Sequence, residues 1–258
     1  MSVKMTTEKN GEFRLRLGGS GIATVDWGDG SEKVTLTLSE EGYPKGVEFK
    51  HTYPNATIRT ITINGNTIVM LACGYITSLD VSKNTSLTEL GCSGSFMSID
   101  LSKNSVLTNL FIDGQLTSLD VSKNTALTEL EVSAQLTSLD VSKNTSLISL
   151  NCANNQLTSL DLSKNTSLEQ IACPRNQLTS LDFSKNIALR HFDCSDNKLD
   201  VSALKSLFES LHSNPPVLDY VKSYNIVGNP GATRIVLESI IEIVVDAERK
   251  GWKNQWNR

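Results

Sequence analysis

One phrase recurs along the middle of the chain and limits what the chain can fold into. "LTSLDVSKNTSL" at residues 136–147 has near-copies that begin at residues 76, 116 and 157. Its aspartate recurs at intervals of 20, 20, 20, 21 and 21 residues, at Asp80, Asp100, Asp120, Asp140, Asp161 and Asp182. A fixed period of this length is typical of solenoids, in which each repeat forms one coil that stacks on its neighbours.

Each repeat has two halves that both alternate like strands. The unit at residues 147–167 reads L-x-x-L-x-C in its first half and L-x-x-L-D-L in its second. In both halves every second residue shares a face, which indicates extended backbone. We therefore predict a mainly β chain with two extended segments per coil and coils about 4.8 Å apart. The template resembles the leucine-rich repeat, whose period is 20–29 residues.

The five cysteines fall in a single column of the repeat. This column contains Cys73, Cys92, Ile112, Val132, Cys152, Cys173 and Cys194. A position that accepts Cys, Ile or Val indicates a buried apolar site, where a free cysteine acts as a small hydrophobe. Stacked strands point such side chains side by side, which disfavours disulfides. We predict a structural core column; redox or metal chemistry is the alternative.

Three polar columns accompany the phrase. The asparagine column contains Asn84, Asn104, Asn124, Asn144, Asn165 and Asn186. An asparagine buried at a bend can bond backbone groups that the turn leaves unpaired, so we expect a stacked ladder. The aspartates, and the lysines that follow three residues later, are expected to face water. Calcium along the aspartate column is the alternative, although no second carboxylate column converges on it.

The outward positions of the first half-coil differ from repeat to repeat, whereas the "DVSKN" half is nearly constant. Stacking needs the same side chains in every coil, but recognition of a partner needs different ones. We therefore place a candidate binding face here; unselected drift is the alternative. Phe111 is the candidate anchor, and Arg175, Arg190 and His191 form a second candidate cluster. The candidate residues are Asn109, Phe111, Glu129, Glu131, Asn151, Gln170, Arg175, Arg190, His191 and Asp193.

Residues 1–66 lack the repeat and read as short strands joined by turns. Alternating apolar residues predict strands at residues 13–17, 22–27, 33–38, 47–51 and 58–63. Their close spacing predicts a small antiparallel β-sandwich. The motifs "VDWGDGS" (residues 25–31), "HTYP" (51–54) and "ITING" (61–65) resemble the polycystic kidney disease (PKD) type domain. That resemblance implies an immunoglobulin-like sandwich of extracellular proteins.

The same motifs suggest a metal site at Asp26, Asp29 and His51. We favour a structural reading, in which Asp29 is a turn residue and both His51 and Tyr53 support the fold. The solenoid itself is expected to occupy residues 67–199.

Residues 200–258 change period again and predict a cap. Apolar spacing predicts a helix at residues 201–212 that ends at "NPP", then a strand at 224–227. After the turn "GNPGA" a second helix is expected at residues 233–250, with Gly251 as its stop. The end of a repeat array exposes its core and requires such a cap.

The order of these parts is similar to the surface leucine-rich repeat proteins of Bacteroidetes-type bacteria. The marks are the repeat phrase, "GNPGA" at residues 228–232 and "KGW" at 250–252. More distantly, the array resembles internalin-type adhesins. The resemblance implies an exported, cell-surface protein with a binding role and names no ligand. Three coils of 20 residues depart from the pattern, because "SGSF", "DGQ" and "SAQ" stand where an "NNQ" turn is expected. We therefore expect the ladder of turn asparagines to be incomplete.

Charge and motifs exclude several classes of function. The 258 residues carry a formal net charge of -4, and no run of Lys and Arg suits nucleic acid. The N-terminus shows no signal-peptide core, and the apolar run at residues 235–245 is too short and charged to span a bilayer. No catalytic motif or cofactor-binding motif is present. We expect no enzyme, no catalytic or metal site, no cofactor and a monomer.

Three functions remain, in the order in which we favour them. The first is binding of a host or bacterial protein through the variable face. The second is cell-surface glycan binding, which needs a row of exposed aromatic side chains and finds only Phe111 on this face, with Trp27 and Tyr53 elsewhere. The third is a structural spacer without a ligand of its own.

Overall fold

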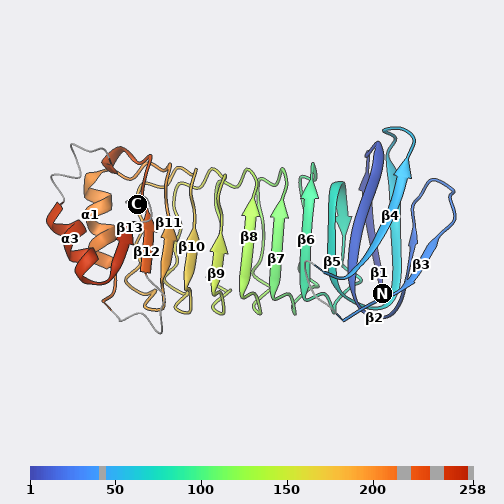
Figure 1. Cartoon of the computed structure of the whole chain (residues 1–258), viewed down its shortest axis with the longest axis horizontal. Helices are drawn as coiled ribbons and strands as arrows, with labels where there is room; N and C mark the ends of the chain where they lie inside the picture. The colour runs from blue at the N-terminus through green and yellow to red at the C-terminus, as the bar shows by residue number, and fades with distance from the viewer. Residues whose placement is uncertain (41–44, 214–221, 233–240, 255–258) are drawn as a thin grey trace. The chain divides into compact units, whose positions relative to one another are not determined.

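The computed structural model describes residues 1–40, 45–213, 222–232 and 241–254, and it is mainly β (Figure 1). The chain divides into two compact units, Met1–Leu127 and Thr128–Arg258. Coils of the repeat build the later part of the first unit and most of the second. No described helix is long and apolar enough to cross a membrane.

The first unit joins the N-terminal strands to the first coils through shared strands. Its strand order is β7-β6-β5-β2-β3, with β4 also on β2 and β1 also on β5. The bounds are β1 (Ser2–Thr7), β2 (Gly11–Asp26), β3 (Val34–Thr37), β4 (Val47–Tyr53), β5 (Arg59–Asp80), β6 (Glu89–Gly94) and β7 (Asn109–Asp113).

The antiparallel pairing expected near the N-terminus is present around β2, which pairs antiparallel with β3, β4 and β5. The segment predicted at residues 13–17 and all but the last residue of the segment predicted at 22–27 belong to β2. Strand β1 departs from the antiparallel pattern because it pairs parallel with β5. Strand β5 also runs through residues 66 and 67, the expected boundary between sandwich and solenoid. The two-sheet sandwich and this boundary stay predictions.

The second unit is a parallel ladder of short strands followed by helices. Its strand order is β8-β9-β10-β11-β12-β13 (Figure 1). The bounds are β8 (Glu129–Ser133), β9 (Ser149–Asn151), β10 (Gln170–Ala172), β11 (His191–Asp193), β12 (Lys222–Asn225) and β13 (Trp252–Asn254). Neighbouring strands pair in register, so that Leu150, Ile171, Phe192 and Tyr224 stack in one column.

Each coil after β5 carries one strand rather than the two extended segments predicted. The "DVSKNTSL" half forms two tight turns instead: the amide of Asn124 donates to Val121 O at 3.0 Å, and that of Leu127 to Asn124 O at 3.1 Å. These turns fold the chain back on itself, so that neighbouring coils meet there through asparagine side chains and not through a strand ladder.

The residues of the predicted core column all lie in the interior. All five cysteines are buried and free of disulfides. Ile112 and Val132 fill the same column and are also buried. Burial raises the pKa of the Cys73 and Cys152 thiols to about 12 and that of Cys194 further. These groups therefore remain uncharged thiols at neutral pH.

Described helices follow the last coil of the repeat. Helix α1 (Val201–Ser210) buries Leu204, Leu207 and Phe208, and the Asp200 carboxylate accepts from the Ala203 amide at its start. The predicted helix was two residues too long, because Leu211 already has extended backbone. A 3₁₀ turn η1 (Pro230–Ala232) and helix α3 (Ile241–Arg249) follow. The "NPP" stop and residues 233–240 of the second predicted helix lie outside the described residues.

Candidate binding surface

The SKN ladder, formed by the asparagine column of the "DVSKN" half, is buried as predicted. Each member is fully buried at 0% exposure: Asn84, Asn104, Asn124, Asn144, Asn165 and Asn186. The Asn124 Nδ2 donates to Leu101 O at 3.1 Å and to Asn104 O at 2.9 Å, both in the preceding coil. Asn104, Asn165 and Asn186 repeat the pattern. The bonds of Asn104, Asn124, Asn165 and Asn186 join coils, and burial closes all six asparagines to a ligand.

The aspartate column is exposed, as predicted, and serves the turns. The Asp120 carboxylate accepts from the Ser122 amide at 2.8 Å, and the other column members do the same. These bonds to serine lower the pKa of Asp80, Asp100, Asp120 and Asp161. The described residues contain no group of three or more His, Cys, Asp or Glu side chains arranged to hold a metal ion.

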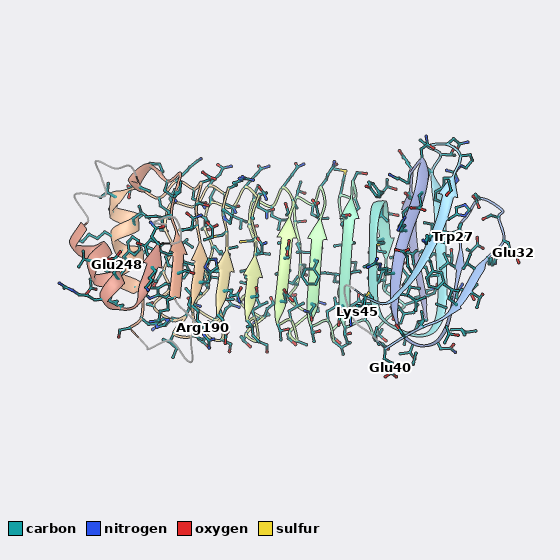
Figure 2. The ribbon with its side chains drawn as sticks, viewed as in Figure 1. Trp27, Glu32, Glu40, Lys45, Arg190 and Glu248 are labelled. Atoms are coloured by element: carbon teal, nitrogen blue, oxygen red, sulfur yellow. The ribbon has the colours of Figure 1, made fainter. Side chains whose placement is uncertain are left out.

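The aromatic and acidic motifs near the N-terminus form a packed structural cluster around Trp27, which is labelled in Figure 2. The His51 Nε2 lies 2.7 Å from Asp29 Oδ2, and the His51 ring stacks on Trp27 with 5.1 Å between centroids. The Tyr53 hydroxyl donates to Trp27 O at 2.8 Å. Asp29 accepts from the Ser31 amide, and its bonds to Ser31 and His51 hold its pKa well below the usual range. Asp29 thus lies in a turn, and His51 and Tyr53 make contacts within the fold, as their predicted structural roles require.

We call the outward side chains of the coil strands the strand face and describe it in each unit separately. In the first unit, Asn109 and Phe111 point outward from β7, on either side of buried Leu110. Phe111 is half-buried rather than exposed as expected. Its register partner on β6 is Gly91, which has no side chain to cover the ring.

In the second unit the strand face carries Glu129 and Glu131 on β8, Asn151 on β9, Gln170 on β10, and His191 and Asp193 on β11. Glu131 and Gln170 are exposed, and the others are half-buried. The His191 Nδ1 lies 2.8 Å from Ser223 Oγ, and burial lowers the pKa of His191. The face therefore presents acidic groups on β8, amides on β9 and β10, and mixed groups on β11.

The predicted cluster of Arg175, Arg190 and His191 is not brought together. Arg190 directly precedes β11 and lies 3.5 Å from Glu169 Oε1 (Figure 2). Arg175 follows β10 and lies in the turn beyond its end. Because β10 and β11 are parallel, the start of one and the end of the other lie at opposite edges of the ladder. Arg190 and His191 therefore lie next to each other at the start of β11, whereas Arg175 lies at the opposite edge of the ladder.

A second ladder lies in the turns that follow β9–β12, at the "NNQ"-type turns where the sequence predicted an incomplete asparagine ladder. We call it the turn ladder; its members are Asn155, Asn176, Asn197 and Asn229. The Asn176 Oδ1 accepts from the Leu157 amide at 3.0 Å, and its Nδ2 donates to Cys152 O at 2.9 Å and Cys173 O at 3.1 Å. Asn229 makes the same bonds from the "GNPGA" segment. Its sequence signal is an asparagine three residues after the Cys column, and Asn229 is the member that the sequence prediction did not include.

Two predicted face residues also hold these turns. The Asn151 Oδ1 accepts from the Ala153 amide at 3.1 Å, and the Asp193 Oδ1 from the Ser195 amide at 2.9 Å. Asn225 does the same for Val227 in the next coil. At this position of the coil, asparagine and aspartate therefore perform the same structural task.

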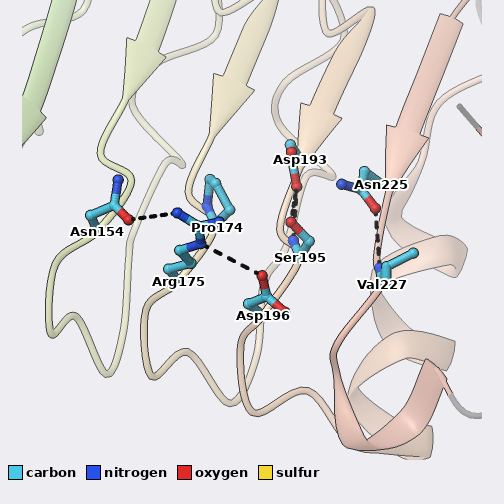
Figure 3. Close-up of a pocket in the computed structure, with 8 residues that line it drawn as sticks. All are labelled: Asn154, Pro174, Arg175, Asp193, Ser195, Asp196, Asn225 and Val227. Carbon is cyan, nitrogen blue, oxygen red and sulfur yellow. Dashed lines mark hydrogen bonds and ion pairs between the residues drawn. The ribbon is translucent and has the colours of Figure 1, made fainter. Parts of the chain in front are cut away.

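A groove of about 460 Å³ lies beyond the ends of these strands, and we call it the end groove (Figure 3). Its lining consists of Asn154, Pro174, Arg175, Asp193, Ser195, Asp196, Asn225 and Val227. Arg175 reaches between two neighbours: one guanidinium nitrogen is 3.4 Å from Asn154 Oδ1, and its Nε is 3.8 Å from Asp196 Oδ2. Arg175 and Asp193 are thus the two predicted residues that the structure places in one concave site.

Comparison with known proteins supports the fold. No family model and no curated protein matches the chain. An internalin from Listeria monocytogenes is 24% identical, with a TM-score of 0.51 over 62% of this chain and 54% of that one. A leucine-rich repeat protein from Leptospira interrogans is 16% identical, with a TM-score of 0.50 over 68% and 50%.

The functional domain of InlJ from Listeria monocytogenes is 30% identical, with a TM-score of 0.49 over 61% of this chain. The chain spans between 39% and 54% of the length of these three structures. The likeness to the internalin and the Leptospira protein shows a solenoid of the leucine-rich repeat type.

Proposed function

We propose that the chain is a non-catalytic protein-binding module whose partner docks on the strand face. One observation carries this proposal: the side chains that repeat are already used for structure, and those that differ from coil to coil point outward. The SKN ladder is buried, and the aspartate column bonds its own turns. Specific recognition is therefore left to the strand face.

The chemistry of this face suits a protein partner. Around β7 a half-buried aromatic ring lies beside an amide, a combination that serves as an anchor in protein interfaces. Strand β8 in the second unit presents two carboxylates, Glu129 and Glu131, which can select a partner by charge. The short strands follow one another in register, so each adds its outward residues to a continuous surface within its unit.

A place at the cell surface is the second part of the proposal. It rests on the resemblance of the repeat and its flanks to surface leucine-rich repeat proteins. The cysteines are compatible with an oxidising compartment, because the thiolate is the reactive form and burial keeps these groups protonated.

The experiment compares charge reversals of equal size on the two halves of one coil. Partners are captured on the immobilised chain from surface-protein extracts, identified and purified, and their affinity is then measured with single variants. Glu131→Lys alters the strand face, and Lys143→Glu alters the constant half of the same unit. Phe111→Ser and Arg190→Ser test the predicted anchor and the β11 edge.

We expect a purified partner that loses at least tenfold in affinity with Glu131→Lys or Phe111→Ser and keeps it with Lys143→Glu. A tenfold loss corresponds to about 1.4 kcal/mol, which a single anchor residue readily supplies. Partners that respond only to Lys143→Glu would place the site on the constant half. Saturable binding to a glycan array with no protein partner would favour the glycan alternative.

A further inference from the structure

The end groove contains the Asp193 carboxylate, of which one oxygen accepts hydrogen bonds within the turn and the other does not. The Asp193 Oδ1 accepts hydrogen bonds from the amide and from the hydroxyl of Ser195, at 2.9 and 2.6 Å. Its Oδ2 has no hydrogen-bond partner among the residues that the structure describes. Asp193 is half-buried, so its orientation is fixed before any ligand arrives. Asp193 lines the groove, and a pre-oriented carboxylate at such a place is an acceptor for a cationic donor.

The other charged groups of the groove already face one another. The Nε of Arg175 lies 3.8 Å from Asp196 Oδ2, and both side chains are largely exposed, at 70% and 54%. With two carboxylates and one guanidinium, the lining carries a net charge of -1. Because Asp196 is partly neutralised by Arg175, the unmatched negative charge belongs to Asp193.

Two apolar side chains complete the lining. Val227 is 52% exposed, and Pro174 is half-buried at the end of β10. A lysine or arginine side chain carries an aliphatic stem that covers apolar surface while its charged head reaches a carboxylate. The combination of exposed apolar surface and an unmatched carboxylate fits such a side chain better than an anion or a purely apolar group.

We propose that the end groove receives a basic side chain, arginine or lysine, from the protein partner, with its head on Asp193 Oδ2 and its stem against Val227 and Pro174. This inference rests on the proposed function and adds a subsite beside the strand face. Arg175 determines the selectivity of the groove for a ligand with a single positive charge, since it already pairs with Asp196 and leaves only the Asp193 carboxylate unmatched.

The test uses the intact chain and the tripeptide Ac-Gly-Arg-Gly-NH₂. Its glutamine and glutamate counterparts serve as neutral and acidic probes. Binding is followed by nuclear magnetic resonance through the backbone amides of Ser195, Asp196 and Val227. We expect saturable shifts of these amides with the arginine peptide and none with the glutamate peptide.

The deciding variant is Asp193→Asn, which removes the charge and keeps the turn. Asn151 and Asn225 show that asparagine accepts the same amide bond at this position of neighbouring coils. We expect a three- to fivefold weaker affinity for the arginine peptide, the size of a partly exposed ion pair. The matched control is Asp182→Asn, the same change in a turn of the constant half, which should leave the affinity unchanged.

Arg175→Gly gives an effect of opposite sign. It removes a like charge and frees the Asp196 carboxylate, so we expect the arginine peptide to bind at least as tightly as to the unaltered chain. Weaker binding to this variant would overturn the proposal. Unchanged binding to Asp193→Asn, equal shifts with the glutamate peptide, or no saturable shift at all would overturn it as well.

Failure of this inference and failure of the proposed function can be told apart. If a purified partner responds to Glu131→Lys but not to Asp193→Asn, the strand face binds and the groove does not. Saturable shifts of the groove amides with a free sugar such as N-acetylglucosamine, in place of the arginine peptide, would assign the groove to glycans and overturn the proposal.

Discussion

Two kinds of coil differ by one residue, and that residue changes how the turn after the strand is held. In the three 20-residue coils the turns read "SGSF", "DGQ" and "SAQ"; in the two 21-residue coils they read "ANNQ" and "PRNQ", and the segment after them has the same kind of turn, "SDNK". The longer turns contain Asn155, Asn176 and Asn197, each bonded both within its own coil and to the preceding coil. The shorter turns have no asparagine at this point.

The extra residue also changes what the turn displays. Asn154, Arg175 and Asp196 precede the ladder asparagines and have left-handed backbone, with φ between 52° and 56°. Gly228 occupies the same position before Asn229, at φ 80°. The side chains of Asn154, Arg175 and Asp196 are exposed, and all three line the end groove. The longer coil thus gains both a rigid turn and a site for variable side chains.

The largest effect should come from removing a rung of the turn ladder. Asn176→Ala leaves the buried Leu157 amide without its partner and takes one bond each from Cys152 O and Cys173 O. We expect a loss of about 2–3 kcal/mol in the free energy of unfolding, measured by chemical denaturation. Gln115→Ala, in the turn of a 20-residue coil, is the control and should change it by less than about 0.5 kcal/mol. Equal losses would mean that the two turns are held alike.

The core column is common to both kinds of coil and should respond equally in both. Cys92→Ser in a 20-residue coil and Cys152→Ser in a 21-residue coil each bury a hydroxyl among apolar side chains. We expect each to lower the free energy of unfolding by about 1–3 kcal/mol. Cys152→Val should cost less than about 1 kcal/mol, since Val132 fills this column in the preceding coil.

Equilibrium unfolding of the four proteins in denaturant checks these values. A large difference between the two serine variants would show that the extra residue alters core packing as well as the turn.

The left-handed position should favour glycine over arginine. Arg175→Gly relieves a backbone strain of about 1 kcal/mol in the folded state. The greater conformational entropy of the unfolded variant offsets about half of this stabilisation. We expect a net gain of about 0.5 kcal/mol in thermal or chemical unfolding. The control, Arg190→Gly, changes an arginine outside the set of positive-φ residues and should destabilise the chain. Loss of stability in Arg175→Gly would mean that its contacts with Asn154 and Asp196 outweigh the strain.

Acid should affect both kinds of coil to a similar, smaller extent. The folded state lowers the pKa of Asp120, in a 20-residue coil, and of Asp161, in a 21-residue coil, through bonds from Ser122 and Ser163. A depressed pKa stabilises the fold above the unfolded value, near pH 4, and this contribution is lost as pH falls through the folded value. The melting temperature should therefore fall progressively below about pH 4.

Asp120→Asn and Asp161→Asn should each reduce that acid sensitivity slightly and by the same amount, because asparagine keeps the amide bond without titrating. Calorimetric scans between pH 2 and pH 7 measure this. If only one of the two variants changed the acid sensitivity of the melting temperature, the aspartate turns of the two kinds of coil would differ, although the structure shows the same bonds in both.

The repeat made much of the fold predictable, and the limits have physical causes. Recurrence at a fixed period revealed the core column, filled by Cys, Ile or Val, and the SKN ladder, filled by Asn, because stacking demands the same kind of side chain in every coil. The "LDV" half was predicted as a second extended segment, because alternation does not show that the next residues close two turns. Asn229 was missed because no copy of the phrase precedes it, so its register became visible only with β12 in place.

The candidate site was predictable in part. Alternation identified the outward residues of β7–β11, and Arg175 and Asp193 do line a groove. The prediction that Arg175, Arg190 and His191 form a cluster was wrong, because nearness in sequence does not determine which edge of a parallel ladder a residue reaches. The half-burial of Phe111 depends on neighbouring coils, which a single repeat cannot reveal.

The smallest effect should occur at the first rung of the SKN ladder. Asn84 is fully buried, yet among the described residues neither its Oδ1 nor its Nδ2 has a partner. No earlier "SKN" turn precedes it to offer carbonyls, whereas Asn104 finds those of Val81 and Asn84 itself. A buried amide without partners opposes folding, and its removal offsets the small cavity that alanine leaves.

We therefore expect Asn84→Ala to change the free energy of unfolding by less than about 0.5 kcal/mol, against a loss of about 1–2 kcal/mol for Asn104→Ala. Chemical denaturation of the two variants measures the difference. Because the same atoms are deleted from two equally buried asparagines, the comparison isolates the bonds to the preceding coil. Equal losses would mean that this column stabilises the coils by filling volume, and that the turn ladder alone works through its hydrogen bonds.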